Sequence, residues 1–369
     1  MAAAPAPLRL GLLGAARIGP EAVVRPCAAF PGAELCAVAA RSLEKAEAFA
    51  SEHGVPKAYG GYADLLADPD IDCVFNCLPN DAHHMWTLRA IAAGKHVLCE
   101  KPFTSNAAEA AEVAQAAADA GVVAMEAFHW RYHPFFHRVQ DTLRRRSSIG
   151  TLQDVHVHFA ANLDNYCKRD DNGAARSAGA VHSAEEDIRY SWDRAGGATM
   201  DLGAYCISFI RHVTGEEPRC VGAKASQWPK DPRIDEAMSA SFELPSGARA
   251  SFFTTFQQER DGDEPGVYAV LRGDRGTMLV RDFLFPWKSS TLQIERGGAV
   301  VEQEIDRFGS TGSPGASTYY HQLVSFCASV STGGSLAVPT DADDAARNMR
   351  VVDAVYRSSG MHPRGVSVA

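Results

Sequence analysis

The segment VLCEKPF, residues 97–103, places two opposite charges directly after an apolar run. Glu100 and Lys101 follow residues typical of the end of a buried strand, and Pro102 restricts the next backbone angle. Local structure alone does not need both charges, whereas a reaction site at the end of a sheet would use them. The pair is therefore a first candidate for chemistry, and an exposed lysine in a tight turn is the alternative.

A second candidate lies in the segment GGATMDLGAY, residues 196–205. Apolar residues recur from there at the spacing of one helical stripe: Leu202, Cys206, Phe209, Ile210 and Val213. Polar residues follow the neighbouring stripe, which places Asp201 and Tyr205 one turn apart on one polar edge of the helix. These two side chains are candidates for moving a proton, and a tyrosine packed between a helix and a sheet is the alternative.

A third candidate is a nucleotide site in GLLGAARIG, residues 11–19. Gly14, Ala16 and Gly19 occupy the three positions of a G-x-G/A-x-x-G fingerprint, with Arg17 and Ile18 inside it. The first glycine permits a tight turn, the small second residue lets a pyrophosphate approach the backbone, and the third lets a helix pack on the strand. The phosphates would lie at the helix N-terminus. An ordinary glycine-rich turn is the alternative.

The end of the second predicted strand bears on which nucleotide binds. An NAD site usually places an acid there, roughly 20 residues beyond the fingerprint, to bind the ribose 2′-hydroxyl. Here the segment AVAARS has no acid before Glu44, and Arg41 and Ser42 follow the strand instead. Because a guanidinium matches a phosphate geometrically, NADP is favoured, and NAD stays possible. A solvated arginine at a strand end is the alternative.

Two patterns of hydrophobicity divide the chain. Up to residue 126, short apolar runs alternate with helical stretches, which predicts a doubly wound parallel sheet covered on both faces. The predicted strands are 8–13, 34–40, 73–78, 96–99 and 122–127, and the predicted helices are 43–53, 83–93 and 106–120. After about residue 150, alternating segments such as DVHVHFAA predict a large, mostly antiparallel sheet with one covered face, and 169–187 is predicted to form a long loop or lid. We therefore expect an α/β protein with a nucleotide-binding domain at 1–126 and a substrate-binding and oligomerisation domain at 127–369.

Length, charge and composition bound the class of protein. The 369 residues suffice for two domains, and a formal net charge of −9 argues against a nucleic-acid partner or an anionic membrane surface. No apolar run approaches the roughly 20 residues that span a bilayer. The start of the chain lacks the basic segment of a signal peptide, and the nine scattered cysteines fit reduced thiols, so we expect a cytoplasmic protein.

Three histidines recur every four residues, at His129, His133 and His137. Pro134 makes a continuous helix unfavourable there, and no thiol or carboxylate completes a metal site. No metal is therefore expected. A second pair, His156 and His158, alternates along a predicted strand and is expected to face solvent.

Taken together, the motifs resemble a known family. GLLGAARIG, PNDAH (79–83), AGKHVLCEKP (93–102) and GGATMDLGAY stand in the order and spacing of the glucose–fructose oxidoreductase/inositol dehydrogenase/MocA family. The resemblance covers nearly the whole chain and implies a Rossmann domain followed by an α/β domain on a large open sheet. It also implies hydride transfer between a nicotinamide cofactor and a hydroxyl or carbonyl carbon of a sugar, polyol or related ring, in a homodimer or homotetramer. The chain looks closest to the branch of NADP-dependent D-xylose dehydrogenases and dimeric dihydrodiol dehydrogenases.

The resemblance implies a catalytic role for three residues. Lys101 would contact the reacting oxygen and the cofactor ribose and stabilise developing negative charge. Its bond to Pro102 is implied to be cis. Tyr205 would be the acid/base; a free tyrosine titrates near pH ~10, and the positive charge of Lys101 would favour its phenolate. Asp201 would hydrogen-bond substrate hydroxyls or orient the base.

The resemblance also extends the cofactor site. Glu100 would orient the Lys101 ammonium or hold the adjacent loop. Pro79 and Asn80 precede His83, which matches a family position near the nicotinamide, and a residue at a helix N-terminus is the alternative for His83.

Three further residues are candidates for the substrate pocket. His129 and Arg131 follow the predicted domain crossover. One expectation is that they line the substrate pocket, and the alternative is a role in the core or in a hinge. Arg189 is a candidate contact for a substrate hydroxyl or phosphate. It lies in the segment DIRY, which also resembles nucleotide-sugar 3-ketoreductases.

The leading hypothesis is an NADP-dependent oxidoreductase acting on a sugar, polyol or diol, similar to D-xylose 1-dehydrogenase or trans-dihydrodiol dehydrogenase. A nucleotide-sugar 3-ketoreductase is the closer alternative, and it would need a basic or aromatic pocket for the nucleotide diphosphate. A non-catalytic NADP-binding sensor is the alternative of another class. Such a sensor need not retain Lys101, Asp201 and Tyr205 together.

Overall fold

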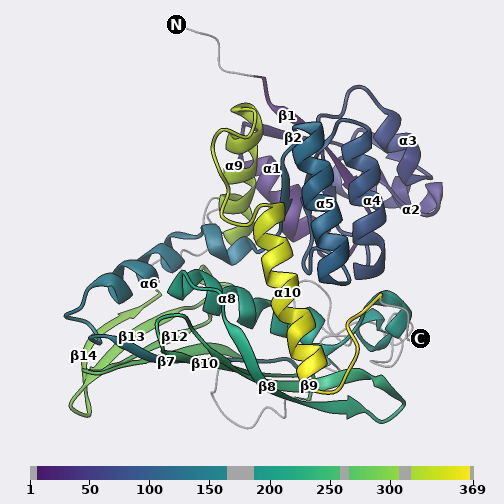
Figure 1. The fold of residues 1–369 in the computed structure, drawn as a ribbon. Coiled ribbons are helices and arrows are strands. Elements are labelled where there is room, and N and C mark those ends of the chain that lie inside the picture. Colours follow the sequence, from purple (N-terminus) through teal and green to yellow (C-terminus); the bar gives the residue numbers. More distant parts are fainter. Residues whose placement is uncertain (1–5, 164–186, 258–265, 307–316, 366–369) are drawn as a thin grey trace, which may run out of the picture. The chain divides into compact units, whose positions relative to one another are not determined.

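Two sheets dominate the computed structural model, which describes residues 6–163, 187–257, 266–306 and 317–365 (Figure 1). The described residues divide into two compact units. The first contains the chain up to Tyr132 and a later segment that ends at Ala346, and the second contains the remainder. The predicted loop at 169–187 lies outside the described residues except for Asp187.

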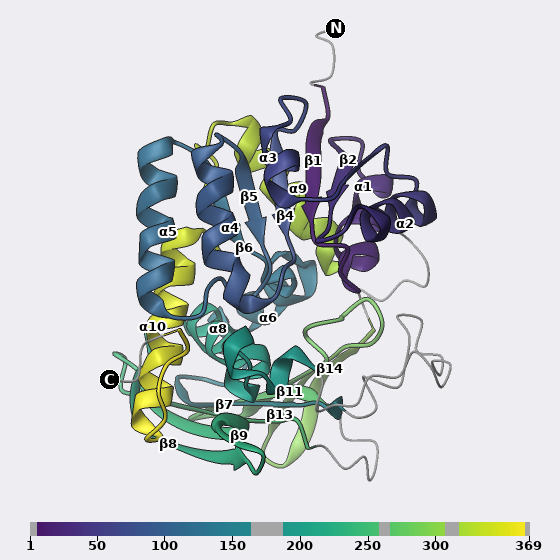
Figure 2. The same ribbon diagram turned by 90° about the vertical axis from the view of Figure 1, so that its right-hand side faces the viewer.

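The first unit is built on a six-stranded parallel sheet with the strand order β3-β2-β1-β4-β5-β6 (Figure 2). Its strands are β1 (Leu8–Leu13), β2 (Ala33–Ala39), β3 (Lys57–Tyr59), β4 (Cys73–Asn76), β5 (His96–Cys99) and β6 (Ala124–Glu126). Its helices and helical turns are η1 (Pro20–Val24), α1 (Arg25–Ala29), α2 (Leu43–His53), α3 (Tyr62–Ala67), α4 (Asn80–Ala92), α5 (Ala107–Ala120), η2 (His129–Tyr132) and α9 (Thr318–Ser331). Both faces of the sheet are covered, by α1 and α9 on one side and by α4 and α5 on the other (Figures 1 and 2). The central strand β4 is consequently buried along its whole length, as the apolar runs of the sequence predict.

Two of the predicted helices carry clear start and stop signals. α2 begins after Ser42, whose hydroxyl accepts the Lys45 N–H, and ends at Gly54 in the left-handed conformation. α5 begins after Asn106 and ends at Gly121 in the same way. The predicted ranges 43–53 and 106–120 therefore match to within one residue. β3 and α3 are absent from the sequence-based prediction, because three and six residues are too few for a periodic pattern.

A segment from far along the chain completes the first unit. α9 packs on η1, α1 and η2, where Phe30 meets Tyr320 edge-on at a ring-centroid distance of 6.1 Å. Beyond α9, Thr340 accepts the Glu126 N–H at 2.8 Å and donates its hydroxyl to the Glu126 carbonyl at 2.7 Å. The sequence places the domain boundary at residue 126, whereas the first unit extends to Tyr132 and includes this returning segment. Hydrophobic periodicity identifies a helix but not the unit that it joins.

The second unit is built on an eight-stranded sheet with the strand order β14-β13-β12-β11-β7-β10-β9-β8. Its strands are β7 (Leu152–Ala160), β8 (Arg219–Trp228), β9 (Asp231–Glu243), β10 (Arg249–Thr255), β11 (Val267–Gly273), β12 (Thr277–Arg281), β13 (Thr291–Arg296) and β14 (Ala299–Ile305). Its helices and helical turns are α6 (Pro134–Arg144), η4 (Ile188–Tyr190), η5 (Trp192–Arg194), η6 (Thr199–Gly203), α8 (Ala204–Thr214) and the part of α10 (Ala342–Ser358) beyond Ala346. Among the described strands of this second sheet, only β7 and β10 pair in parallel, so the predicted large, mostly antiparallel sheet is confirmed.

One face of this sheet is covered by helices and the other is open. Figures 1 and 2 show α6 and α8 on the covered face, and no described helix lies on the other. In β7 the buried Val155 and Val157 alternate with His156 and His158, which are half-buried on the open face. His156 bonds to Ser251 at 3.0 Å, and the ring of His158 stacks on Tyr268 at 4.8 Å. The two histidines therefore lie on the open face, but neighbouring side chains shield them.

No helix among the described residues has the length and apolarity needed to cross a membrane.

Candidate functional site

The glycine fingerprint forms the turn between β1 and η1. Gly14 has a φ of +104°, and a Cβ there would lie 3.1 Å from the Leu78 side chain, so the turn favours glycine. A Cβ at Gly19 would lie 3.2 Å from the Phe49 ring, which shows how closely the helical segment approaches the core. Ala16, Arg17 and Ile18 are half-buried between these two glycines. Small residues are thus placed where the fingerprint needs them.

Arg41 and Ser42 follow β2 at the carboxyl edge of the same sheet. The Arg41 side chain is exposed, and Ser42 caps α2 by accepting the Lys45 N–H at 3.4 Å. Burial raises the pKa of the Tyr62 phenol, and the positive charge of Arg41 opposes that shift. The strand end therefore presents an exposed cation, and the residues from Ala37 to Leu43 include no acid.

Hydrogen bonds from backbone N–H groups hold the turn that carries Lys101 in place. The Glu100 N–H donates to the Asn76 carbonyl at 2.8 Å, and the Lys101 N–H donates to the Glu100 carboxylate at 3.2 Å. The Phe103 N–H donates to the Glu126 carboxylate at 2.9 Å. The Lys101–Pro102 bond is cis, as the resemblance implies. These anchors fix the backbone from which the Lys101 side chain extends.

His83 connects this turn to the end of β4. Its ring is 1% exposed, with Nδ1 2.7 Å from the Pro102 carbonyl oxygen and Nε2 2.7 Å from the Leu78 carbonyl oxygen. Burial lowers the pKa of His83, and the two carbonyl contacts oppose that shift. The imidazole is thus engaged by backbone carbonyls on both sides, where it supports the segment between β4 and α4, which ends at Pro79 and Asn80, and the turn after Lys101.

Two supports of the lysine turn were not predicted from the sequence. Asn76 is fully buried, and its amide donates to the His83 carbonyl at 3.2 Å and to Thr87 Oγ1 at 3.1 Å. Glu126 is also fully buried and accepts the Phe103 N–H. Both are polar residues at the end of an apolar strand. Because an unpaired polar group is costly to bury, such a position indicates a structural hydrogen bond, and this pattern could have identified them from the sequence.

In the second unit, an ion pair joins two predicted site residues. η6 is a single π-helical turn that carries Asp201, whose Oδ2 accepts Arg189 Nε at 2.7 Å. Arg189 also contacts Asp187, which accepts its backbone N–H at 2.9 Å and its Nη1 at 3.2 Å. The side chains of Asp201 and Arg189 are 14% and 23% exposed, respectively. Both remain accessible while each restrains the other.

Tyr205 lies in the first turn of α8, directly after η6. Its side chain is 6% exposed, and its ring meets Phe159 of β7 edge-on at 5.9 Å. The predicted apolar stripe, from Leu202 to Val213, is buried as expected. The neighbouring stripe, which carries Tyr205 and Ser208, was expected to be a polar edge. It is more buried than expected, because Ser208 is fully buried as well.

His129 and Arg131 both lie in η2 of the first unit. His129 is 1% exposed, with Nδ1 2.6 Å from Thr318 Oγ1 and its ring 4.1 Å from the ring of Tyr319. These contacts are those of a buried core residue, which is one of the alternatives given above for His129. Arg131 is half-buried.

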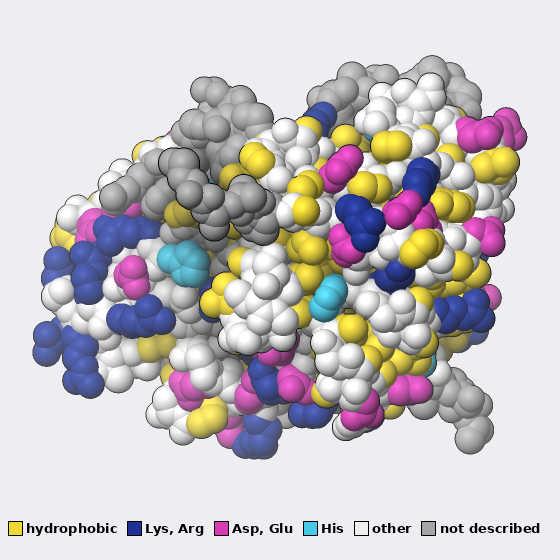
Figure 3. All heavy atoms as spheres, turned by 90° about the horizontal axis from the view of Figure 1, so that it is seen from above, with side chains coloured by type: hydrophobic (Ala, Val, Ile, Leu, Met, Phe, Trp, Pro, Cys, Tyr) yellow, Lys and Arg dark blue, Asp and Glu magenta, His cyan; other side chains and the backbone are white. Residues whose placement is uncertain are grey.

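The repeated histidines do not share an element. His133 caps α6 by accepting the Phe135 N–H at 3.1 Å, and Pro134 begins that helix, whereas His129 belongs to η2. Within the described part of the chain, no group of three His, Cys, Asp or Glu side chains is arranged to hold a metal ion. The face drawn in Figure 3 mixes basic and acidic side chains with neutral ones.

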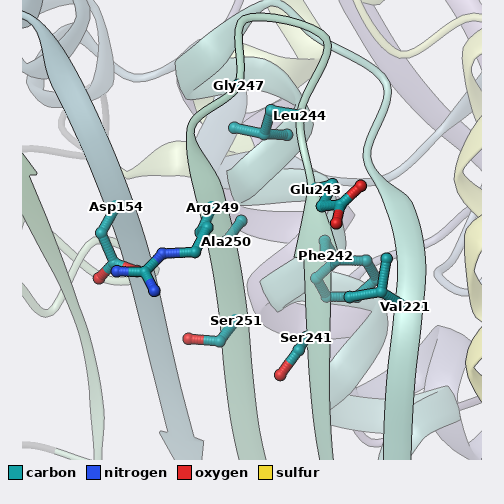
Figure 4. Close-up of a pocket in the computed structure, with 10 residues that line it drawn as sticks. All are labelled: Asp154, Val221, Ser241, Phe242, Glu243, Leu244, Gly247, Arg249, Ala250 and Ser251. Carbon is teal, nitrogen blue, oxygen red and sulfur yellow. The ribbon is translucent and has the colours of Figure 1, made fainter.

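A surface hollow lies on the sheet of the second unit (Figure 4). Its walls come from β7, β8, β9, β10 and the turn between β9 and β10, and Figure 4 shows Arg249 pointing toward Asp154 on the neighbouring strand. None of the predicted site residues lines this hollow. It therefore has no part in the predicted chemistry.

A glycine fingerprint on the first strand of a doubly wound sheet, with a lysine anchored where β5 ends, defines a dinucleotide-dependent oxidoreductase of the Rossmann type. Comparison with family models gives the same class. The model described as "Oxidoreductase family, NAD-binding Rossmann fold" matches residues 8–128, and the GFO/IDH/MocA C-terminal domain model matches residues 136–279. The chain belongs to the GFO/IDH/MocA family.

Individual relatives support this assignment over most of the chain. D-xylose 1-dehydrogenase (NADP(+)) 2 of Haloferax volcanii is 33% identical over 95% of this chain and 97% of its own length. Trans-1,2-dihydrobenzene-1,2-diol dehydrogenase of Sus scrofa is 32% identical over 80% of this chain and 77% of its own length. Among solved structures, the 3-ketoreductase KijD10 of Actinomadura kijaniata, in complex with NADP and TDP-benzene, has a TM-score of 0.79 at 26% identity and covers 95% of this chain and 98% of its own. The family and branch indicated by the sequence motifs are confirmed.

Proposed function

We propose that the protein is an NADP-dependent oxidoreductase that acts on a CH–OH carbon of a sugar, polyol or related diol. The observation that carries the proposal is the pair of charged sites built into the two units. One is Lys101, whose backbone is anchored by buried groups, and the other is the pair of Arg189 with Asp201 of η6, the turn that leads directly into α8 and Tyr205. The NADP-dependent D-xylose dehydrogenase relative, similar along nearly the whole chain, supports the cofactor and the substrate class.

In the proposed mechanism, each residue acts on the substrate oxygen or its neighbours. Bound NADP supplies the hydride acceptor in oxidation and the hydride donor in reduction. Tyr205 removes the hydroxyl proton in oxidation and returns it in reduction. Lys101 stabilises negative charge on that oxygen, and Asp201 accepts a hydrogen bond from a neighbouring hydroxyl while Arg189 holds its carboxylate in place.

A screen for cofactor reduction tests this function. The protein is incubated with NADP⁺ and single aldoses, polyols or trans-diols, and NADPH is followed by its absorbance. We expect turnover with at least one of these compounds in wild type and its near-complete loss in the Tyr205→Phe variant purified in parallel. Failure of every compound in both reaction directions would contradict the proposal, and a protein that binds NADPH without turnover would be the sensor.

A nucleotide-sugar 3-ketoreductase is the second candidate, because KijD10 shares the fold at 26% identity. The Arg189 guanidinium, a candidate phosphate contact, is engaged by Asp187 and Asp201, which weakens that candidate. The two functions are separated by assaying NADPH oxidation with a nucleoside-diphosphate ketosugar and with the corresponding free sugar. Activity restricted to the nucleotide-linked substrate would favour the ketoreductase.

Cofactor choice provides a prediction on Arg41. NADPH is expected to bind more tightly than NADH, and Arg41→Ala is expected to remove most of the difference. A charge-assisted contact to the 2′-phosphate contributes roughly 1.5–3 kcal/mol, which corresponds to about ten- to a hundredfold in affinity. Titration by quenching of tryptophan fluorescence measures both affinities, with Arg144→Ala as a control because Arg144 is 71% exposed in the second unit. Equal affinities for NADPH and NADH in wild type would refute the role of Arg41.

We further propose that the protein is a homodimer or homotetramer that pairs through the open face of the eight-stranded sheet. That face carries the half-buried aromatic residues Tyr268 and Phe253 around His158, and apolar surface of this kind is commonly covered by a partner. Sedimentation at micromolar concentration is expected to show at least twice the chain mass of 39.6 kDa. Phe253→Asp should shift the protein toward the monomer, whereas Lys45→Asp on α2 should not. A wild type that sediments only as a monomer would contradict this proposal.

A cytoplasmic location is also proposed. It is supported by the described cysteines, which form no disulfide and are mostly buried. Fractionation of the source cells, with blotting for the protein, tests it.

A further inference from the structure

A buried ion pair lies beneath the site of the second unit. Arg364, near the end of the chain, donates from Nη2 to Asp235 Oδ1 at 2.7 Å. Both side chains are 0% exposed. Replacing such a pair by apolar residues is often neutral for stability, so its presence calls for an explanation beyond stability.

The two partners hold opposite ends of one short segment. Arg364 Nε donates to the Gly196 carbonyl at 2.7 Å, and Asp235 Oδ2 accepts the Thr199 N–H at 2.7 Å. Tyr356 of α10 donates its hydroxyl to Asp235 Oδ1 at 2.9 Å. The segment 196–199 is therefore fixed by charge-assisted hydrogen bonds at both ends.

Aromatic rings hold the guanidinium in place. The central carbon of the Arg364 guanidinium lies 4.2 Å from the ring centroid of Tyr356 and 4.7 Å from that of Trp192. Arg233 lies against the same Trp192 ring at 5.3 Å, and its side chain is 56% exposed. Of these two arginines, Arg364 is the buried one that bonds to the segment 196–199.

This arrangement explains why two glycines stand in sequence. Gly197 has a φ of +129°, and a Cβ there would lie 2.2 Å from Asp235 Oδ1 and 2.7 Å from Arg364 Nη2. A Cβ at Gly196 would lie 2.4 Å from the Arg189 carbonyl oxygen. Any side chain would separate the segment from the ion pair or from the backbone of Arg189.

The same segment sets the position of the predicted site residues. The Gly197 N–H donates to the Arg189 carbonyl at 2.8 Å, and the Asp201 N–H donates to the Gly197 carbonyl at 3.0 Å. The side chains of Arg189 and Asp201 then meet at 2.7 Å. A displacement of Gly196–Gly197 would move both partners of that ion pair and the start of the helical segment that leads to Tyr205.

We propose that Arg364 and Asp235 form a clamp that positions Asp201 and Tyr205 for the reaction. They are positioning residues, because they bond to the backbone that carries the site and not to its side chains. The inference rests on the proposed function.

The test removes the pair without leaving a single buried charge. In the double variant Arg364→Met/Asp235→Leu, both charges are replaced by apolar groups, so the fold is expected to be retained while Gly196, Thr199 and the Tyr356 hydroxyl lose their partners. The turnover number per folded molecule is expected to fall about ten- to a hundredfold, as for a misplacement of about 1 Å. The dissociation constant for NADPH is expected to stay within twofold of wild type, because the fingerprint and Arg41 belong to the other unit.

Conservative and matched variants sharpen the result. Arg364→Lys keeps a positive charge beside Asp235 but replaces the planar fork that spans Asp235 and Gly196, so it should restore turnover only in part. Arg233→Met removes the exposed arginine that also contacts the Trp192 ring and should leave turnover within threefold of wild type. Melting temperature and circular dichroism are recorded for each variant, so that the turnover number refers to folded protein.

Hydrogen exchange separates the clamp from the function on which it rests. In the double variant, amides of residues 197–205 should exchange at least tenfold faster than in wild type and in Arg233→Met, whether or not a substrate is known. Unchanged exchange of these amides would overturn the clamp. So would a turnover number within threefold of wild type, or a loss of turnover matched by an equal loss of NADPH affinity. If wild type turns over no substrate while exchange changes as expected, the proposed function fails, whereas the hold of Arg364 and Asp235 on residues 196–199 is supported.

Discussion

Tyr205→Phe is expected to lower the turnover number by about 10²–10⁴-fold while leaving NADPH affinity nearly unchanged. The substitution removes the hydroxyl that would carry the proton but keeps the ring that packs edge-on against Phe159. Stability should therefore change little. Steady-state kinetics at saturating NADP⁺, with a substrate identified in the screen, measures the effect.

Tyr268→Phe is a suitable control for this prediction. It removes a tyrosine hydroxyl in the same unit but retains the stacking on His158. A Tyr205→Phe variant that turns over within threefold of wild type would show that Tyr205 is a packing residue. The proton carrier would then be sought at Lys101, His83 or His129, and the two histidines are only 1% exposed.

Lys101→Met should reduce the turnover number by about 10²–10³-fold, the loss typical of removing one group that stabilises a developing oxyanion. It should also weaken the binding of NADPH and substrate, because the proposed contacts of the ammonium include both the reacting oxygen and the cofactor ribose. Turnover and fluorescence titration together give the two effects. Lys45→Met, an exposed position on α2, is the control for loss of a lysine charge in the same unit.

The comparison of the two variants distinguishes their roles. Tyr205→Phe is expected to affect turnover alone, whereas Lys101→Met is expected to affect turnover and binding. If Lys101→Met retained full activity, the buried supports of its turn, such as Glu126 and His83, would serve the fold and not the reaction.

The sequence predicted the architecture more completely than the boundaries. Five of the six strands of the parallel sheet, all except β3, were predicted because a buried strand between two helical layers is nearly all apolar. β3 was not predicted, since its three residues, Lys57–Tyr59, are half-buried and show no pattern. The return of α9 to the first unit was not predicted either, because its partners lie far back along the chain, 189 positions earlier for His129 and Thr318 and further for Phe30 and Tyr320.

The candidate site shows the same division between local and long-range information. The fingerprint, Lys101 and the Asp201–Tyr205 spacing are local motifs, and they could be read directly. Arg364 could not be, because its bonds reach Asp235 and Gly196 over 129 and 168 positions and its own surroundings in sequence are an ordinary chain end. The double glycine was a visible signal, but a sequence does not show which atoms approach a glycine.

The returning segment also limits how the nucleotide-binding unit can be transplanted. A fragment that stops at Tyr132 lacks α9 and Thr340, so it loses the cover over α1 and the partner of Glu126. It would expose apolar surface that α9 covers, such as the Phe30 ring that Tyr320 contacts, and we expect such a fragment to aggregate. A graft of this unit into another enzyme must therefore carry two separate pieces of chain and a new linker between them. The nucleotide-binding unit is therefore compact in space but is made of two segments that are separated in the sequence.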